Sequence, residues 1–428
     1  MQAEVLARLP LMATIDLKYG HGATPLKYDE SRFTVLSTDL SLPPLSDAEI
    51  GKALDSPIDS PPLEDLVSRG QRVLLAVPDA TRQTGAGQVV NLAVRRLIAN
   101  GSAPNDINII FATGIHRRVT DEEQKAILSP FIVQRIKTLH HKADDPVRNF
   151  RLGETSGGIP VELNWTLTEY DHVVLVGGIT FHYFAGFTGG RKLICPGLAS
   201  AKTIEETHKL AFDCRSLGRR EGVGTGLLDG NPVHEAFTEA AAFTKPSFAI
   251  NTLVDEQGRI VDLYCGNWIS SHRQACDVYA ERHTLRVTEK RDLVIVSCGG
   301  YPFDINMIQA HKALEAASHA CNEGGTIIFF AECAEGLGRS DFLDWLSAAD
   351  SRELGHKLCE QYQVNGQTAW SLLRKAESFD VRLVSNLSPD IAVKMRLSPI
   401  TANSIKDIKI GGGKSGYIIP LGAKLRIV

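Results

Sequence analysis

Short apolar runs alternate with amphipathic stretches along the chain, and this alternation limits the folds that it can adopt. The runs Gln71–Pro78, Ile107–Ala112 and His172–Val176 are typical of buried strands. Between the first two, Gln88–Ala99 has helical spacing of apolar residues, and Thr120–Glu123 has the pattern that opens a capped helix. Strand–helix–strand order is typical of parallel sheets, because the helix returns the chain to the starting edge. The sequence therefore predicts an α/β protein with mainly parallel sheets.

A second unit of the same kind is expected in the C-terminal part. Leu293–Ser297 and Thr326–Ala331 are its first two predicted strands, with a helix between them. A length of 428 residues suits two or three domains. We predict an N-terminal α/β domain over 1–280, a C-terminal α/β domain over 281–428, and an active-site cleft between them. The pattern leaves open whether the last strand, near 417–419, pairs with the first domain.

Composition excludes several classes of protein. The formal net charge is −4 and no long Lys/Arg run occurs, so neither nucleic acid nor an anionic membrane is an expected partner. No apolar run reaches the length of a membrane span, and the N-terminus lacks a signal-peptide pattern. The eight cysteines are scattered without a C-x-x-C pair, which argues against a zinc ribbon, a redox motif or a disulfide framework. A cytoplasmic protein is expected.

The unusual polar clusters all follow predicted strands. In open α/β sheets, ligands bind beyond the carboxyl ends of the strands, so these clusters are candidates for one site. They are residues 79–82, 113–118, 177–192 and 299–304, the last leading to Gln309 and Lys312.

Each cluster by itself is weak evidence. Asp79 and Arg82 could form a helix cap and a surface ion pair, and a lone loop histidine is more often structural than catalytic. The glycine-rich run matches neither G-x-x-x-x-G-K-[ST] nor G-x-G-x-x-G, so it is neither a Walker loop nor a dinucleotide fingerprint. Its backbone N–H groups, leading to Lys192, can still bind a phosphate.

Taken together, the clusters resemble the nickel-dependent lactate racemase family. His182 and Lys192 are ten residues apart, and His208 follows sixteen residues later, which is similar to the core signature of that family. The residues that carry the resemblance are Asp79–Arg82, Gly114–Arg117, His182, Ala185–Lys192, Cys195–Gly197, His208, Asn231–His234 and Gln309–Lys312.

The resemblance implies a nickel pincer nucleotide, a pyridinium-3-thioamide-5-thiocarboxylate mononucleotide that carries nickel. It implies covalent attachment of this cofactor to Lys192 through a thioamide and nickel ligation by His208. An imidazole is an ordinary nickel ligand. Cofactor-biosynthesis proteins are then expected partners. The other residues expected to bind the cofactor are Asp79, Thr188, Gly189 and Gly190.

The implied reaction inverts the C2 centre of a 2-hydroxycarboxylic acid. The hydrogen on C2 of such an acid is weakly acidic, so its removal as a proton would leave an unfavourable carbanion. Transfer of this hydrogen to the cofactor as a hydride, and its return to a planar keto acid, avoids the carbanion. His116 and His182 would serve as acid and base on opposite sides, since imidazole titrates near neutral pH. The residues expected to bind the substrate are Arg82, Gln309 and Lys312.

One departure from the pattern concerns the substrate. Ile308 precedes Gln309, where the lactate enzymes favour an aromatic residue. A smaller side chain there predicts room for a 2-hydroxyacid longer than lactate.

Other interpretations remain open from the residues alone. His208, within the predicted helix 200–210, reads as a surface or capping histidine, and Lys192 as a phosphate-loop lysine. A nicotinamide-dependent oxidoreductase with a divergent cofactor loop is the alternative enzyme, although no acidic ribose-binding residue stands at the required spacing. A cofactor carrier or storage protein is the alternative outside enzymes, but it would not need both His116 and His182.

Overall fold

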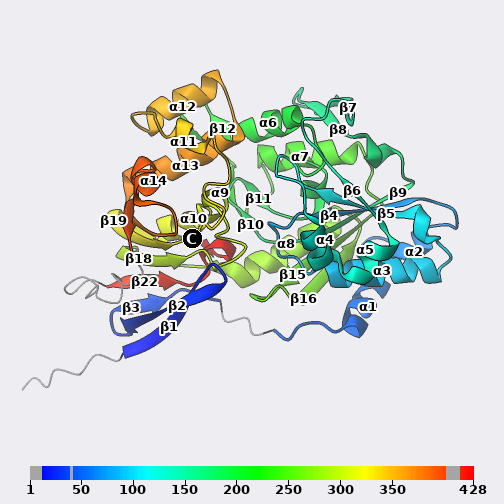
Figure 1. The fold of residues 1–428 in the computed structure, drawn as a ribbon, viewed down its shortest axis with the longest axis horizontal. Helices are drawn as coiled ribbons and strands as arrows, with labels where there is room; N and C mark the ends of the chain where they lie inside the picture. Colours follow the sequence, from blue (N-terminus) through cyan, green and yellow to red (C-terminus); the bar gives the residue numbers. More distant parts are fainter. Residues whose placement is uncertain (1–11, 39–41, 402–414) are drawn as a thin grey trace, which may run out of the picture. The chain divides into compact units, whose positions relative to one another are not determined.

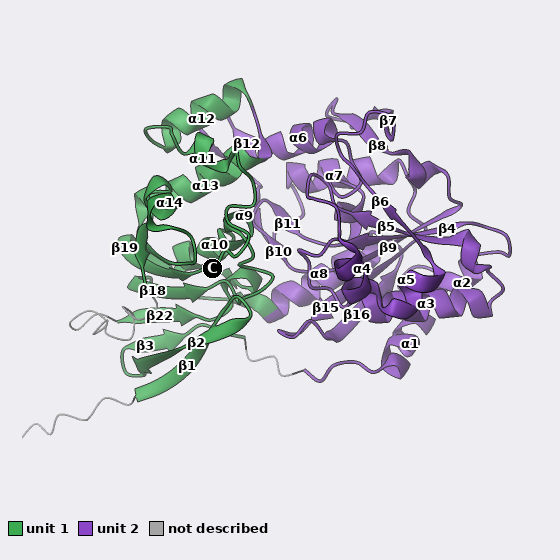
Figure 2. Ribbon diagram, viewed as in Figure 1, with its two compact units in different colours: residues 1–38, 283–361, 365–428 green, residues 39–282, 362–364 purple. Residues whose placement is uncertain are grey.

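A computed structural model describes residues 12–38, 42–401 and 415–428. The chain divides into two compact units, coloured separately in Figure 2. Unit 1 contains residues 1–38, 283–361 and 365–428, and unit 2 contains residues 39–282 and 362–364.

Unit 2 is built on a six-stranded sheet in the order β16-β15-β9-β4-β5-β6 (Figure 1). Its strands pair in parallel, except that β15 and β16 form an antiparallel hairpin. The strands are β4 (Val73–Pro78), β5 (Ile107–Ala112), β6 (Lys137–His140), β9 (His172–Gly178), β15 (Phe248–Val254) and β16 (Ile260–Gly266).

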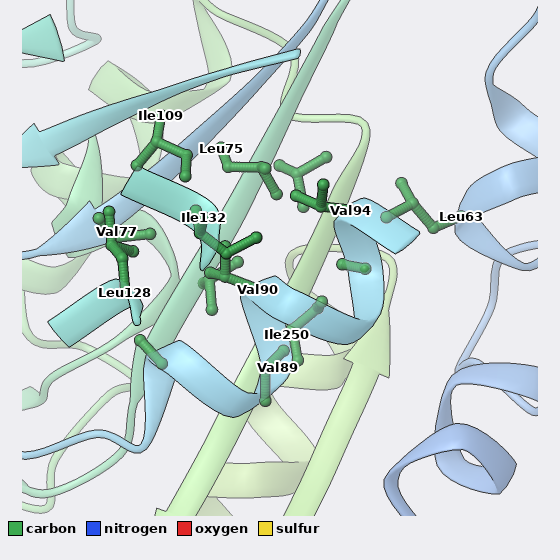
Figure 3. Packing of buried hydrophobic residues seen from close by; sticks show 14 of the residues in the cluster. Leu63, Leu75, Val77, Val89, Val90, Val94, Ile109, Leu128, Ile132 and Ile250 are labelled. Atoms are coloured by element: carbon green, nitrogen blue, oxygen red, sulfur yellow. The ribbon is translucent and has the colours of Figure 1, made fainter. Parts of the chain in front are cut away.

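Helices cover both faces of this sheet because its central strands are apolar on both sides. In β4, Val73, Leu75 and Val77 pack in one cluster with helix α3 (Ala86–Ala99). Leu74 and Ala76 pack in another with helix α7 (Pro232–Ala242). Successive side chains of a strand point to opposite faces, which explains this division. Figure 3 shows the first cluster, in which Val89, Val90 and Val94 of α3 meet Leu75 and Val77.

The helices of unit 2 are α1 (Asp47–Asp55), α2 (Leu63–Leu66), α3 (Ala86–Ala99), α4 (Asp121–Leu128), α5 (Pro130–Arg135), α6 (Ala201–Lys209), α7 (Pro232–Ala242) and α8 (Ser270–His283). Short 3-10 turns are η1 (Pro104–Asp106), η2 (Trp165–Thr168) and η3 (Gly190–Leu193). Small sheets pair β7 (Asn149–Glu154) with β8 (Pro160–Asn164), β12 (Phe212–Asp213) with β13 (Gly218–Arg219), and β11 (Ala185–Phe187) with both β10 (Phe181–His182) and β14 (Gly224–Thr225).

Unit 1 contains a second six-stranded sheet, entirely parallel, in the order β21-β20-β19-β18-β22-β3. Its strands are β18 (Arg291–Ser297), β19 (Cys321–Phe330), β20 (Asp380–Val384), β21 (Ser398–Ile400), β22 (Gly416–Ile419) and β3 (Phe33–Val35). Its helices are α9 (Met307–Ala310), α10 (Ala313–Ala320), α11 (Phe342–Trp345), α12 (Ser351–Glu360), α13 (Val364–Ser378), α14 (Pro389–Lys394) and the 3-10 turn η4 (Gly422–Lys424). A hairpin of β1 (Met12–Tyr19) and β2 (Gly22–Asp29) precedes β3, and β17 (Thr284–Leu285) pairs with β23 (Arg426–Ile427).

This division differs from the predicted domains 1–280 and 281–428 at the N-terminus. The first strands belong to unit 1, because β3 pairs in parallel with β22, with Phe33 opposite Gly416. A three-residue strand has no pattern that assigns it to a sheet, so its partner could not be read from the sequence. The last strands, β22 and β23, pair within unit 1 rather than with the first domain.

Two expectations from composition can be compared with the described residues. Over residues 12–38, 42–401 and 415–428, no helix is both long enough and apolar enough to cross a membrane. Six of the eight cysteines are free and buried: Cys195, Cys265, Cys276, Cys298, Cys321 and Cys333. The other two, Cys214 and Cys359, are disulfide-bonded, so the expectation of cysteines without disulfides is wrong for these two residues.

Candidate active site

Three of the predicted polar clusters follow adjacent strands of unit 2. The strands β9, β4 and β5 are neighbours in the sheet and run in parallel, so their carboxyl ends share one edge. Residues 79–82 follow β4, residues 113–118 follow β5, and residues 179–192 follow β9. These three loops therefore begin at the same edge of the sheet, and that all four predicted clusters form one site stays a prediction.

His116 is held by a buried carboxylate. Its Nδ1 lies 2.7 Å from Oδ2 of Asp79, which is 6% exposed, while Oδ1 of Asp79 accepts hydrogen bonds from the backbone and hydroxyl of Thr81. Burial would raise the pKa of Asp79, but the interaction with His116 and the Arg82 charge lower it well below its usual range. The carboxylate therefore accepts the Nδ1 proton and leaves the Nε2 lone pair of neutral His116 for chemistry.

Arg82 lies beside the same carboxylate. Its backbone N–H donates to the carbonyl of Asp79 at 3.2 Å, and the side chain is half-buried. Burial lowers the pKa of Arg82, and the Asp79 charge opposes that shift. The guanidinium remains a cation at neutral pH, so it can bind an anionic substrate group.

His182 has the opposite tautomer in its neutral form. The backbone N–H of Ala185 donates to its Nδ1 at 3.3 Å, so the proton of the neutral ring is on Nε2. The tight turn between β10 and β11, where His182 pairs with Gly186, creates this contact. The ring packs against Phe184 with centroids 4.4 Å apart.

Lys192 and His208 lie on the same two aromatic rings. Nζ of Lys192 is 5.5 Å from the centroid of Phe184 and 4.9 Å from that of Phe237. The ring of His208 lies 5.1 Å from the Phe184 ring and 5.4 Å from the Phe237 ring. Since His182 also packs on Phe184, one phenylalanine is in contact with all three predicted functional residues of this part of the chain.

His208 is prepared to act as a neutral ligand. Its Nδ1 donates to the carbonyl of Ile204 at 2.7 Å, one turn earlier in α6, which leaves the Nε2 lone pair for a metal. Burial and the nearby Lys192 lower the pKa of His208 to about 3, so the ring is neutral at physiological pH. The alternative interpretation of His208 as a surface histidine is wrong, because this residue is only 6% exposed.

The His116 loop and α6 lie next to each other. The N–H of Gly114 donates to the carbonyl of Gly197 at 2.8 Å. A Cβ on Gly114 would contact the side chain of Ile204, the residue whose carbonyl accepts the hydrogen bond from His208. The hydrogen-bonded pair of Asp79 and His116 is therefore adjacent to the helix that carries His208, the predicted metal ligand.

The predicted phosphate-binding residues have other contacts. The hydroxyl of Thr188 donates to the carbonyl of Gly178 and accepts from the N–H of Thr180, both at 2.8 Å. Gly189 and Gly190 have φ of +73° and +48°, respectively. A Cβ on Gly189 would lie 2.6 Å from the Ile179 side chain, and a Cβ on Gly190 would lie 2.6 Å from the His272 ring. These glycines are required by the packing of the loop itself, and a role of this loop in cofactor binding stays a prediction.

Gln309 and Lys312 belong to unit 1, at α9 and at the start of α10. Nζ of Lys312 donates to Oε1 of Gln309 at 2.6 Å, so the amide of Gln309 is oriented with its NH₂ group as the remaining donor. The neighbouring His311 donates from Nδ1 to the carbonyl of Ile308 and is buried, as expected of a structural residue. That this pair shares a site with Arg82 stays a prediction.

Sequence reasoning missed the aromatic residues of this site. Phe184 lies inside the His182–Lys192 motif, but Phe237 lies 45 residues after Lys192, on α7, and carried no signal of its own. Among the described residues, no group of three or more His, Cys, Asp and Glu side chains could hold a metal ion.

Comparison with known proteins gives a consistent result. Family models described as the lactate racemase N-terminal domain and the lactate racemase C-terminal domain match residues 19–218 and 287–407. A lactate racemase of Lactiplantibacillus plantarum is 32% identical over 344 residues, covering 79% of each chain. A lactate racemase of Thermoanaerobacterium thermosaccharolyticum is 30% identical over 352 residues, covering 81% of each chain.

Solved structures agree on the fold. The lactate racemase apoprotein from Thermoanaerobacterium thermosaccharolyticum matches with a TM-score of 0.85 and 27% identity, covering 97% of this chain and 100% of that one. A protein from Thermotoga maritima matches with a TM-score of 0.69 at 20% identity, covering 90% and 99%, which shows the fold alone.

Proposed function

Since the chain belongs to the lactate racemase family, we propose that it inverts the C2 centre of a 2-hydroxycarboxylic acid by reversible hydride transfer. The proposed cofactor is a nickel pincer nucleotide attached to Lys192. The observation that supports this most directly is the placement of Lys192 and His208 on the same rings of Phe184 and Phe237. A covalent anchor and a metal ligand for one cofactor must lie this close together.

The residues present fit this cofactor. His208 is neutral and offers Nε2, the Lys192 amine is next to it, and the rings of Phe184 and Phe237 can pack against a planar heterocycle. When bound, the cofactor would supply a hydride acceptor that the side chains of the protein lack. Delivery of this cofactor requires cofactor-biosynthesis proteins, which we propose as partners.

His116 and His182 would handle the hydroxyl proton. His116 is ready to accept a proton at Nε2, and the Asp79 carboxylate stabilises the imidazolium that results. For His182 to take up or release a proton at Nε2, its Nδ1 must be protonated and the 3.3 Å contact with the Ala185 N–H must be lost. Loss of the acceptor of this buried N–H costs about 1–3 kcal/mol. The two histidines are thus chemically similar but not equivalent.

The charged donors favour a carboxylate substrate. Arg82 is a cation in the loop after β4, and Lys312 with the oriented NH₂ of Gln309 offers only donors. Ile308, in place of an aromatic residue, favours a substrate longer than lactate. A difference of one or two methylenes is worth about 1–3 kcal/mol, so several substrates can be accepted.

The proposal is tested with protein produced together with the cofactor pathway. Peptide mass spectrometry should find the adduct on Lys192, and Lys192→Arg, which keeps the charge, should carry none and be inactive. Loaded enzyme is then given single enantiomers of lactate, longer aliphatic 2-hydroxyacids, malate and aldonic acids, each with deuterium at C2.

Retention of most of the deuterium in the inverted product supports hydride transfer. Complete exchange with solvent would mean direct deprotonation and would overturn the mechanism, as an adduct on another lysine would overturn the attachment site. A clear preference for lactate would contradict the larger pocket and leave family membership intact.

A further inference from the structure

Arg191, the residue before Lys192, is a buried cation without a carboxylate partner. It is 2% exposed, and among the ion pairs of the described residues none includes it. Its guanidinium donates from Nη2 to the carbonyl of Ala185 at 2.9 Å and from Nη1 to that of Thr188 at 3.4 Å. Its buried Nε has no hydrogen-bond partner within the part of the chain that the structure describes. Burial of an uncompensated charge is costly, and burial lowers the pKa of Arg191 to about 10. The proposed function assigns no task to this side chain.

The strongest contact of Arg191 outside its own loop is with His272 on α8. Nη1 of Arg191 lies 2.9 Å from Nε2 of His272, which is 4% exposed. A guanidinium can only donate, so Nε2 must be the acceptor, and the ring is neutral with its proton on Nδ1. The thiol of Cys276, one helical turn later, lies 3.7 Å from Nδ1 and 3.5 Å from Nε2. The carbonyl of Thr188 is 3.0 Å from Nε2 and would accept from it only in the other tautomer, which would place two donors, Nε2 and Nη1 of Arg191, 2.9 Å apart.

His272 also packs against the loop backbone. A Cβ on Gly190 would lie 2.6 Å from Cδ2 of His272, so the imidazole fills the space that a side chain would need. Gly190 has φ +48° and begins η3, the turn that contains Lys192. One imidazole therefore contacts the two residues that immediately precede Lys192, by a hydrogen bond to Arg191 and by van der Waals contact with Gly190.

We propose that His272 is a positioning residue for Lys192. Its neutral imidazole accepts a hydrogen bond from Arg191 and packs on Gly190, and so holds η3 in the conformation that places the Lys192 amine over Phe184 and Phe237. The positioning itself is a property of the protein without cofactor. Only its consequence, efficient attachment of the cofactor, rests on the proposed function.

The test measures the Lys192 amine in protein made without the cofactor pathway. A limiting dose of acetic anhydride acetylates lysines according to their accessibility, and peptide mass spectrometry compares Lys192 with Lys142, whose side chain is 70% exposed. In His272→Leu the acceptor is lost, and we expect Lys192 acetylation to rise about fivefold or more relative to Lys142. In His272→Gln the Oε1 atom can replace Nε2, and labelling should stay within about twofold of wild type.

The control is Cys276→Ala, which removes the thiol next to the imidazole but keeps the Nε2 acceptor for Arg191, and it should leave Lys192 labelling unchanged. All variants are compared below their melting temperatures. If His272→Leu does not fold, His272→Asn, whose amide is too short to reach Arg191, takes its place with the same expected rise.

Two outcomes would overturn the proposal: wild-type labelling in a folded variant without the acceptor, or equal effects of the Gln and Leu substitutions. The adduct fraction on Lys192 is then measured in the same variants made with the cofactor pathway. Absence of the adduct from wild-type protein would contradict the proposed function alone, because the labelling experiment uses no cofactor.

Discussion

At the scale of single residues, the contact between Asp79 and His116 decides what the imidazole can do. A carboxylate accepts the Nδ1 proton, whereas a carboxamide can turn its NH₂ toward Nδ1 and force the proton to Nε2. Asp79→Asn therefore keeps the shape of the side chain but disfavours the tautomer of His116 that has a free lone pair on Nε2. We expect kcat for racemisation to fall about 10²–10⁴-fold, as for loss of a general base.

Steady-state kinetics on loaded enzyme measure this change, and the mass of the Lys192 peptide shows whether loading is normal. The control is Thr81→Val, which removes one hydrogen bond to the carboxylate and keeps its charge. Near-normal turnover of a fully loaded Asp79→Asn protein would contradict the assignment of His116 as base.

At the scale of secondary-structure elements, Asn231 connects α7 to the aromatic residues of the site. Its Oδ1 caps α7 by accepting from the N–H groups of Val233 and His234, and its Nδ2 donates to the carbonyls of Phe184 and Leu227. The side chain is fully buried. Asn231→Ala should lose about 1 kcal/mol from the cap and about 1–3 kcal/mol from the unpaired carbonyls.

Urea unfolding of the protein without cofactor measures the loss in free energy of unfolding. Asn231→Ser separates the two contributions, because its hydroxyl can still cap the helix but is too short to replace the bonds of Nδ2 to the carbonyls of Phe184 and Leu227. A destabilisation by Ala of less than about 0.5 kcal/mol would show that this cap does not stabilise α7, since such caps ordinarily contribute about 1 kcal/mol.

At the scale of the whole molecule, buried histidines make stability depend on pH. Burial lowers the pKa of His141 to about 4, and those of His208, His234 and His311 to about 3. In the unfolded chain these groups take up protons near pH 6.5, while in the folded protein they stay neutral. The unfolded state thus binds more protons in this range, so stability is full above about pH 6.5 and falls as the pH decreases.

Urea unfolding at intervals from pH 4.5 to 8 should show this loss, and the lower limit keeps the titration of Asp79 out of the range. His141→Gln should lower the free energy of unfolding at all pH values, because the hydrogen bonds to Ala199 and Asn164 change. It should also reduce the slope of the free energy of unfolding against pH, below pH 6.5, by an amount that corresponds to at most one proton. A stability that is constant over this range would contradict the neutral state of these histidines.

The features that the sequence alone determined are those that depend on near neighbours in the chain. Strand β4 is the apolar run that the sequence predicts. Thr120 forms the expected capping box with Glu123, only three residues further along the chain. The carboxyl-end position of the Asp79 and His116 loops follows from strand order. The motif from His182 to His208 was sufficient to predict the family that the comparisons show.

Tertiary structure decided the features that join distant segments. The pairing of Phe33 with Gly416 places the first strands in unit 1, and no local pattern specifies a partner so far along the chain. Phe237 and His272 reach the Lys192 loop from α7 and α8. An apolar side chain or a neutral imidazole on a helix has the same sequence signature whether it packs in an ordinary core or against a functional loop. Only the packing of those helices on the sheet distinguishes the two, because burial and hydrogen-bond partners are properties of the folded chain.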